Sequence, residues 1–376
     1  MLCTTPNVIG PKTPYAKREN MGQCLPKFGR ILVLVLVEQK MKPLTSNYGV
    51  AQSSLECYLR STNYTFKRID LDEDNRAKKY CVQYKQLFFR KHCIASAYLP
   101  ETDWMLVLDA DSGVVNPNHC IEEWIDDRVD LIFYERFFNW EIMSGNYLVK
   151  NTLFARKFLL DWANMEFSQP KFSSADNGAL QLHILKTVLP NAQIEINACT
   201  KYWQRSEDYD SLMAYTTCVR SALGARRIWP PKLRILRRAH GFCRDWFISS
   251  DGWAENDFMF HGWKAHNLSG DWKSPFEKVP NASECTGGYL GWHWRTDTRI
   301  SVNEVRSRLA EIEKSSAANF PQKARIHAHL TEPEDVSVPS TKEAQRCLTC
   351  QIGRDGVLST WYGRKRCWSE GSQPNV

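Results

Sequence analysis

The chain has 376 residues, of which 43% are hydrophobic, and its formal net charge is +7. This length and composition favour a soluble, globular protein of catalytic size with one large core or two small ones. The basic residues crowded between Arg226 and Arg238 are not interleaved with aromatic side chains as stacking platforms, which argues against a nucleic-acid partner. We interpret this stretch as a solvated loop, although it could attract phosphates, acidic glycans or an anionic membrane surface.

The start of the chain is expected to be irregular. Residues 1–29 alternate proline, glycine and charge without helical or strand periodicity, so we predict a leader here. The fold is expected to begin at residue 30, because residues 31–37 are a continuous β-favouring run, as in a strand buried on both faces of a parallel sheet. This run is far shorter than a signal anchor, and no signal peptide or membrane-spanning segment is visible.

Helical and strand patterns alternate after this first strand. In chain order we predict a helix over 47–59, a strand over 65–69, a helix over 77–98, strands over 104–108 and 130–134, helices over 151–167 (capped by Asn151) and 176–187, and a charged helix over 301–314. This order predicts an α/β fold with a single Rossmann-like domain over 30–300 and a central, mostly parallel sheet. Residues 301–376 are expected to form the charged helix and a poorly packed extension.

Two carboxylates follow the strand 104–108 directly. Asp109 and Asp111 are succeeded by a Ser-Gly turn, whereas the other Asp-x-Asp pairs, within 70–74 and at 208–210, lie among polar residues and are expected to be solvated. Paired carboxylates at a strand end are hard oxygen ligands that suit Mn²⁺ or Mg²⁺. Such an ion would neutralise the charge of a departing diphosphate. A capping or turn role for the pair is the alternative.

A second candidate group closes the strand-like run that begins at Asp257. His261 at its end could complete a metal's ligand set, Gly262 would let the backbone approach a phosphate, and Lys264 would offset phosphate charge. A purely structural histidine is an equal alternative, because nothing in the spacing forces His261 to face Asp109.

A third group combines the strand expected over 141–147 with the start of the helix at 176. Gly145 allows a ligand near the backbone and Asn146 can read sugar hydroxyls. Asp176 could act as a base or accept a hydroxyl hydrogen bond, and an ordinary N-cap is equally plausible. On the first strand, Ile31 and Val33 are assigned to the nucleotide-binding set as well.

Cysteine content and glycosylation acceptors point to the same compartment. Thirteen cysteines suggest an oxidising environment, and their odd number leaves at least one unpaired. Cys347-x-x-Cys350 with Cys367 offers three sulfurs and no fitting histidine, so a disulfide, or no bond at all, is favoured over a zinc site. Acceptor sequons at Asn63, Asn267 and Asn281 favour the secretory lumen.

Three segments in order, 109–117, 133–147 and 174–180, resemble a nematode family catalogued as domain of unknown function 273. That family is similar to the galactosyl- and mannosyltransferases of fungi and the xyloglucan xylosyltransferases of plants. The resemblance covers roughly 30–270.

The resemblance implies a metal-dependent glycosyltransferase of the A-type fold, in the Golgi or ER lumen. Its donor would be a nucleotide-diphosphate sugar bound with Mn²⁺ (or Mg²⁺), and its acceptor would be a glycan or glycoprotein. It would transfer a hexose or pentose with retention of the anomeric configuration. Asn177 stands where those enzymes usually have Gln. The implied roles are metal ligation by Asp109, Asp111 and His261, phosphate contact by Lys264, and sugar-pocket or catalytic positions for Asn146 and Asp176.

Two other readings use the same residues. A haloacid-dehalogenase-type phosphatase would make Asp109 a nucleophile, but that fold usually carries the motif on its first strand, with Thr or Val where this chain has Gly113. A transferase fold that only binds nucleotide or glycan is the other alternative.

Overall fold

The computed structural model describes residues 24–38, 48–139, 141–264, 275–285 and 290–330. The chain divides into two compact units, Met1–His327 and Ala328–Val376, and of the second only residues 328–330 are described. The account below therefore concerns the first unit. The extension predicted beyond residue 330, most of the leader and the Cys347, Cys350 and Cys367 prediction lie outside the described residues, as does the sequon at Asn267.

Helices and strands follow each other along the chain, and every strand after residue 227 has four residues or fewer. The strands are β1 Ile31–Val37, β2 Thr65–Asp70, β3 Trp104–Leu108, β4 Gly113–Val114, β5 Leu131–Tyr134, β6 Tyr147–Lys150, β7 Ile228–Trp229, β8 Leu233–Leu236, β9 Cys243–Asp245 and β10 Met259–His261. The helices are α2 Gly49–Arg60, α3 Asn75–Tyr80, α4 Leu87–Tyr98, α5 Leu153–Asn164, α6 Ala175–Val188, α7 Gln193–Gln204, α8 Tyr209–Leu223 and α9 Val302–Leu330. None of the described helices is long and apolar enough to span a bilayer.

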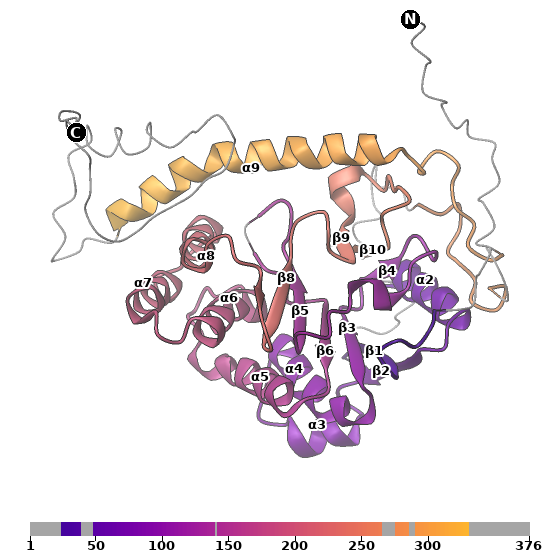
Figure 1. The fold of residues 1–376 in the computed structure, drawn as a ribbon, viewed down its shortest axis with the longest axis horizontal. Helices are drawn as coiled ribbons and strands as arrows, with labels where there is room; N and C mark the ends of the chain where they lie inside the picture. Colours follow the sequence, from indigo (N-terminus) through magenta and orange to yellow (C-terminus); the bar gives the residue numbers. More distant parts are fainter. Residues whose placement is uncertain (1–23, 39–47, 140, 265–274, 286–289, 331–376) are drawn as a thin grey trace, which may run out of the picture. The chain divides into compact units, whose positions relative to one another are not determined.

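A seven-stranded sheet in the order β2-β1-β3-β6-β5-β8-β7 forms the centre of the fold (Figure 1). Strand β1 runs parallel to β2 and β3, and β5 runs parallel to β8, whereas β6 and β7 are antiparallel to their neighbours. The predicted α/β class with a mostly parallel central sheet is confirmed. A smaller sheet, β4-β10-β9, pairs the segment after β3 with strands that come much later in the chain.

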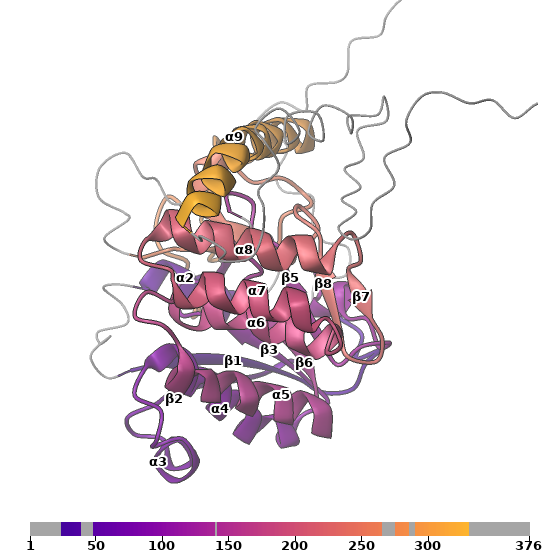
Figure 2. The same cartoon turned by 90° about the vertical axis from the view of Figure 1, so that its left-hand side faces the viewer.

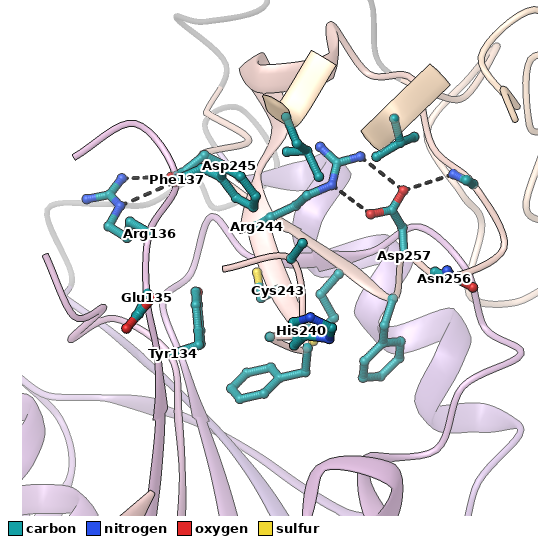
Figure 3. A pocket seen from close by; sticks show the side chains of 18 of the residues that line it. Tyr134, Glu135, Arg136, Phe137, His240, Cys243, Arg244, Asp245, Asn256 and Asp257 are labelled. Carbon is teal, nitrogen blue, oxygen red and sulfur yellow. Dashed lines mark hydrogen bonds and ion pairs between the residues drawn. The ribbon is translucent and has the colours of Figure 1, made fainter. Parts of the chain in front are cut away.

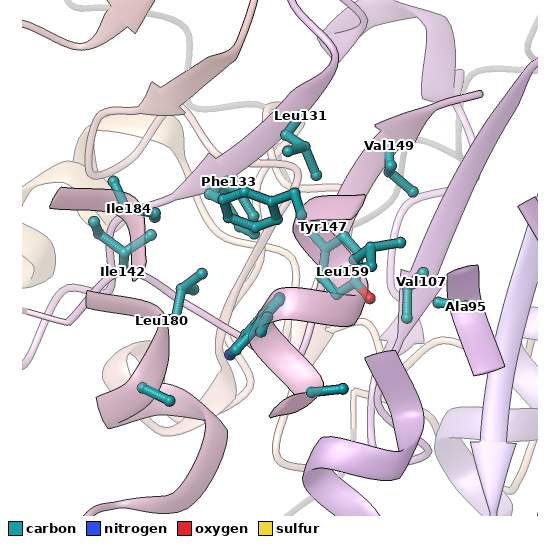
Figure 4. Close-up of a cluster of buried hydrophobic side chains, with 14 of the residues drawn as sticks. Ala95, Val107, Leu131, Phe133, Ile142, Tyr147, Val149, Leu159, Leu180 and Ile184 are labelled. Atoms are coloured by element: carbon teal, nitrogen blue, oxygen red, sulfur yellow. The ribbon is translucent and has the colours of Figure 1, made fainter. Parts of the chain in front are cut away.

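The central sheet is buried on both faces, as the uninterrupted apolar run of β1 predicts. Leu32, Leu34 and Leu36 face one core together with α4, α5 and α6, which lie side by side over the sheet, and α7 and α8 pack against α6 (Figures 1 and 2). Figure 4 shows part of this core, where Phe133 of β5 and Tyr147 of β6 meet side chains of α5 and α6. The alternate residues of β1 face a second core under α2 and the small sheet.

Some predicted elements differ from the observed ones. The predicted helix over 77–98 is two helices, because Asp74 caps α3 and the chain turns at Cys81 before α4 begins. Most of 141–147 is not a strand, since β6 begins only at Tyr147, and Thr152 rather than Asn151 caps α5. Helices α7 and α8 were not predicted, and α9 continues well beyond the expected end at 314.

Four disulfides connect the described residues: Cys24–Cys120, Cys57–Cys285, Cys81–Cys93 and Cys199–Cys218. Among the described cysteines, Cys243 is free and buried. The first disulfide fastens the end of the expected leader to the segment that follows β4, and the second fastens α2 to the segment that follows β10.

Candidate metal centre

Asp109, Asp111 and His261 converge at the carboxyl end of β3. The two aspartates leave β3 in a turn, while His261 ends β10, which pairs with β4 immediately after that turn. The Nε2 atom of His261 lies 3.7 Å from Oδ2 of Asp109 and 3.5 Å from Oδ1 of Asp111. One ligand atom from each of the three lies within 4.8 Å of the others. The structure thus brings together the three residues that were predicted as metal ligands.

The arrangement fits a divalent ion on two counts. Oδ1 of Asp111 is buried and has no hydrogen-bond partner among the described residues, which leaves an acceptor aimed into the cluster. Gly145 clears the other side, since a Cβ at that position would lie only 1.9 Å from Oδ2 of Asp109. Two carboxylates and an imidazole are a donor set that Mn²⁺ accepts readily, and hard oxygens also suit Mg²⁺.

Cationic groups surround these carboxylates. Lys264 Nζ lies 3.2 Å from Oδ2 of Asp111, and His261 Nδ1 is 2.9 Å from Oδ1 of Asp245, which Arg136 also binds at 2.7 Å. Burial would lower the pKa of His261, but Asp111 and the other neighbouring carboxylates raise it to about 10. The hydrogen bond between Nδ1 of His261 and Asp245 fixes the imidazole, so that Nε2 is the nitrogen that faces Asp109 and Asp111.

Lys91 is a functional candidate that the sequence analysis missed. Its side chain, on α4, is 4% exposed, and Nζ lies 2.9 Å from Oδ1 of Asp109 and 3.2 Å from Oδ2 of Asp176. Burial would lower the pKa of Lys91, but the two carboxylates outweigh that cost and raise it. A signal existed, because Lys91 shares the helix stripe of Ala95 and Tyr98, which are both buried, and a lysine in such a stripe needs a partner.

Asn146 and Asp176 lie behind the carboxylate cluster. Asn146 is completely buried, and its Oδ1 accepts hydrogen bonds from the Asp109 amide and the Ser112 hydroxyl, both at 3.0 Å. Asp176 is 1% exposed in the first turn of α6, where Ser174 is the N-cap residue, so Asp176 is not the cap. Burial would raise the pKa of Asp176, but Lys91 and His92 hold it below its usual value.

The remaining predicted residues divide between the cluster and the core. Gly145 abuts Asp109, and Gly262 has a φ of +96°, which a glycine adopts without strain as the chain passes from β10 to Lys264. Ile31 and Val33, in contrast, are buried in the core under α2 and lie apart from the carboxylates.

A pocket of about 320 Å³ lies beside the cluster, between the ends of β5 and β9 and the first turns of α9 (Figure 3). Its wall includes Asp245 and Arg136, so it shares with the cluster the carboxylate that orients His261. Arg244, held to Asp257 at 2.6 Å, and apolar residues of α9 also line it.

Comparisons with known proteins give a family match and distant structural similarities. The family described as "Protein of unknown function, DUF273" matches residues 55–277. No curated protein matches the chain. A glycosyltransferase involved in the glycosylation of the major capsid of PBCV-1 is 14% identical, with 62% of this chain and 93% of that one covered and a TM-score of 0.35. A mannosyltransferase from Pyrobaculum calidifontis in complex with GDP-Man and Mn²⁺ is 10% identical, with coverages of 56% and 73% and a TM-score of 0.26.

Proposed function

The chain belongs to the DUF273 family, and we propose that it is a metal-dependent glycosyltransferase whose donor is a nucleotide-diphosphate sugar. The observation that carries this proposal is the convergence of Asp109, Asp111 and His261 at the carboxyl end of β3 in a mostly parallel α/β sheet. Ligands of such sheets bind at the carboxyl ends of the strands, and paired carboxylates with an imidazole suit the ion that accompanies a diphosphate.

In this proposal Asp109, Asp111 and His261 would hold Mn²⁺ or Mg²⁺ with the atoms that face one another, Oδ2, Oδ1 and Nε2. The bound ion would neutralise the charge that develops on the leaving diphosphate. Lys264 supplies a further cation for the phosphates, and Gly262 allows the backbone to approach them. Asp245 keeps His261 Nε2 directed at the carboxylates, because Nδ1 is engaged at 2.9 Å.

The acceptor in this proposal is a glycan or glycoprotein, and the pocket under α9 is the space beside the donor that would receive part of it. Both polar and apolar side chains line the pocket, as the polar rims and apolar faces of sugar rings require. We include retention of anomeric configuration, and transfer of a hexose or pentose, on the resemblance to fungal and plant transferases alone.

The compartment proposed is the Golgi or ER lumen. Four disulfides among the described residues favour an oxidising environment. Asn63 and Asn281, in two of the acceptor sequons, are exposed, as an attached glycan requires.

The test is a calorimetric titration of UDP and of GDP into the purified protein with and without Mn²⁺. We expect one nucleotide to bind only with the metal, and an Asp109→Ala/Asp111→Ala variant not to bind it. The matched control is Asp127→Ala/Asp161→Ala, which removes two surface carboxylates outside the cluster and should bind as the wild type does.

Failure of the wild type to bind either nucleotide would make the carboxylate cluster a structural feature and end the proposal. Nucleotide binding without any hydrolysis or transfer of the donor sugar would identify a binding protein instead of an enzyme. Release of phosphate from an aryl phosphate would favour a phosphatase.

A further inference from the structure

A chain of buried polar groups runs from the hydrophobic core to the candidate metal centre. The Tyr147 hydroxyl lies 3.0 Å from Nδ1 of His92, and Nε2 of His92 lies 3.0 Å from Oδ2 of Asp176. The same oxygen of Asp176 is 3.2 Å from Nζ of Lys91, which reaches Oδ1 of Asp109 at 2.9 Å. The chain therefore links β6, α4 and α6 to the turn that carries the first aspartate.

The direction of each hydrogen bond follows from the chemistry of its partners. A carboxylate only accepts, so Nε2 of His92 carries the hydrogen donated to Asp176, and Nδ1 accepts from the Tyr147 hydroxyl. His92 is neutral, because complete burial lowers its pKa to about 4. Its ring is further fixed by stacking on Trp162, with centroids 3.4 Å apart. Little freedom remains for His92 to turn.

Lys91, the member of this chain of polar groups that contacts Asp109, determines how Asp109 presents its carboxylate. Oδ1 is occupied by Lys91, whereas Oδ2 points past Gly145 toward His261. Turning the carboxylate away would remove one of the two carboxylate partners of Lys91, whose side chain is only 4% exposed, so this contact favours the observed orientation. Only Oδ2 is thus presented to the cluster formed with Asp111 and His261.

We propose that His92, Asp176 and Lys91 are positioning residues for Asp109, and that they make it a one-oxygen metal ligand, with His92 as the inner anchor. This inference rests on the proposed function, because it needs a metal at the cluster. It gives Asp176 a task different from contact with the sugar, since both hydrogen-bonding neighbours of its Oδ2 belong to the protein.

The test measures the affinity of the protein for Mn²⁺ alone, by the loss of the free-ion electron paramagnetic resonance signal. His92→Phe keeps an aromatic ring against Trp162 but removes both hydrogen bonds, and we expect it to weaken Mn²⁺ binding on the order of tenfold, as loss of a supporting hydrogen bond does. His92→Gln retains an amide donor for Asp176 and should recover most of that loss.

The matched control is His183→Phe. His183 is another buried imidazole on a helix, with Nε2 3.0 Å from the Phe158 carbonyl and its ring against the Phe158 ring. It does not belong to the chain of polar groups that leads to Asp109. Its loss should lower the melting temperature without changing Mn²⁺ affinity. An unchanged affinity in His92→Phe, or an equal loss in His183→Phe, would overturn the inference.

Two further outcomes keep the test decisive. If His92→Phe does not fold, Tyr147→Phe serves in its place, because it removes only the hydroxyl that binds His92. We expect it to weaken Mn²⁺ binding by roughly threefold, less than the loss of His92 itself. Wild-type Mn²⁺ affinity in Tyr147→Phe would reject the inference. Wild-type protein that binds no Mn²⁺ would reject the proposed function as well, whereas wild-type binding with intact affinity in His92→Phe rejects the positioning role alone.

Discussion

Gly145→Ala is expected to disable the metal centre while leaving the fold intact. The added methyl carbon would lie 1.9 Å from Oδ2 of Asp109 and 2.5 Å from Cε of Met143. The methionine end is flexible and can move, but the aspartate is short and its other oxygen is held by Lys91 at 2.9 Å. The carboxylate therefore has to leave the position from which it faces His261.

The size of the effect follows from this geometry. Ordinary contact begins at 3.4 Å, so Oδ2 of Asp109 has to retreat by about 1.5 Å. Metal ligands tolerate only about 0.2 Å of such displacement. Loss of the groups that merely support a ligand costs about 10–100-fold in metal affinity, so displacement of the ligand itself should reach the upper end of that range. We therefore expect Mn²⁺ affinity to fall on the order of 100-fold, or about 2.7 kcal/mol.

The assay is Mn²⁺ titration with a thermal melt of the same sample. Gly49→Ala is the control, because Gly49 begins α2 and a Cβ there meets no atom within 4 Å. Alanine at that position should leave Mn²⁺ affinity unchanged and stabilise the helix by up to about 1 kcal/mol. A Gly145→Ala protein that melts normally and binds Mn²⁺ like the wild type would refute the reasoning.

Two further predictions concern buried carboxyl groups away from the cluster. Burial raises the pKa of Asp251 from 3.8 to about 8. Its contribution to the free energy of unfolding is therefore fully present below pH 3.8 and is lost as the pH rises to about 8, at about 1.4 kcal/mol per pH unit. Asp251→Asn should flatten this dependence in urea unfolding between pH 5 and pH 8, and an unchanged slope would exclude Asp251 as its source. Glu135→Gln removes the carboxylate that pairs with the largely buried Arg220 and the half-buried Arg227, and should cost about 3 kcal/mol in the same assay. Glu313→Gln, whose side chain is 59% exposed and pairs with Arg238 at 3.3 Å, should cost under about 1 kcal/mol; equal losses would contradict the burial argument.

Local patterns were sufficient for the elements that burial dominates. The uninterrupted apolar run of β1 predicts a strand covered on both faces, and the position of Asp109 at the end of the apolar strand β3 singles it out from the other Asp-x-Asp pairs. Asp208, which is expected to be solvated, is exposed and in addition caps α8 in a capping box. Asp is a favoured N-cap residue, but Ser211 stands where the usual capping-box pattern has Glu or Gln, so the sequence marks the start of α8 only weakly.

The pairing of strands that are far apart in the chain cannot be predicted from local sequence patterns. Whether His261 faces Asp109 depends on the register of β10 against β4, which are joined by hydrogen bonds between residues nearly 150 positions apart. The chain spacing contains no information on that register. The helix stripe of Lys91 indicates that it needs a partner, but it does not identify that partner. The two carboxylates come from the turn after β3 and from α6, so only the folded structure identifies them.

The disulfide between Cys57 and Cys285 has a consequence for the order in which the protein is made. Its two cysteines are separated by 228 positions, whereas Cys81 and Cys93 are separated by only 12. At synthesis rates of roughly 5–20 residues per second, Cys57 waits for about 10–45 s before its partner exists. A polypeptide cut short before residue 285 would therefore carry a thiol with no native partner, so closure of this bond marks completion of the chain through the segment that follows β10.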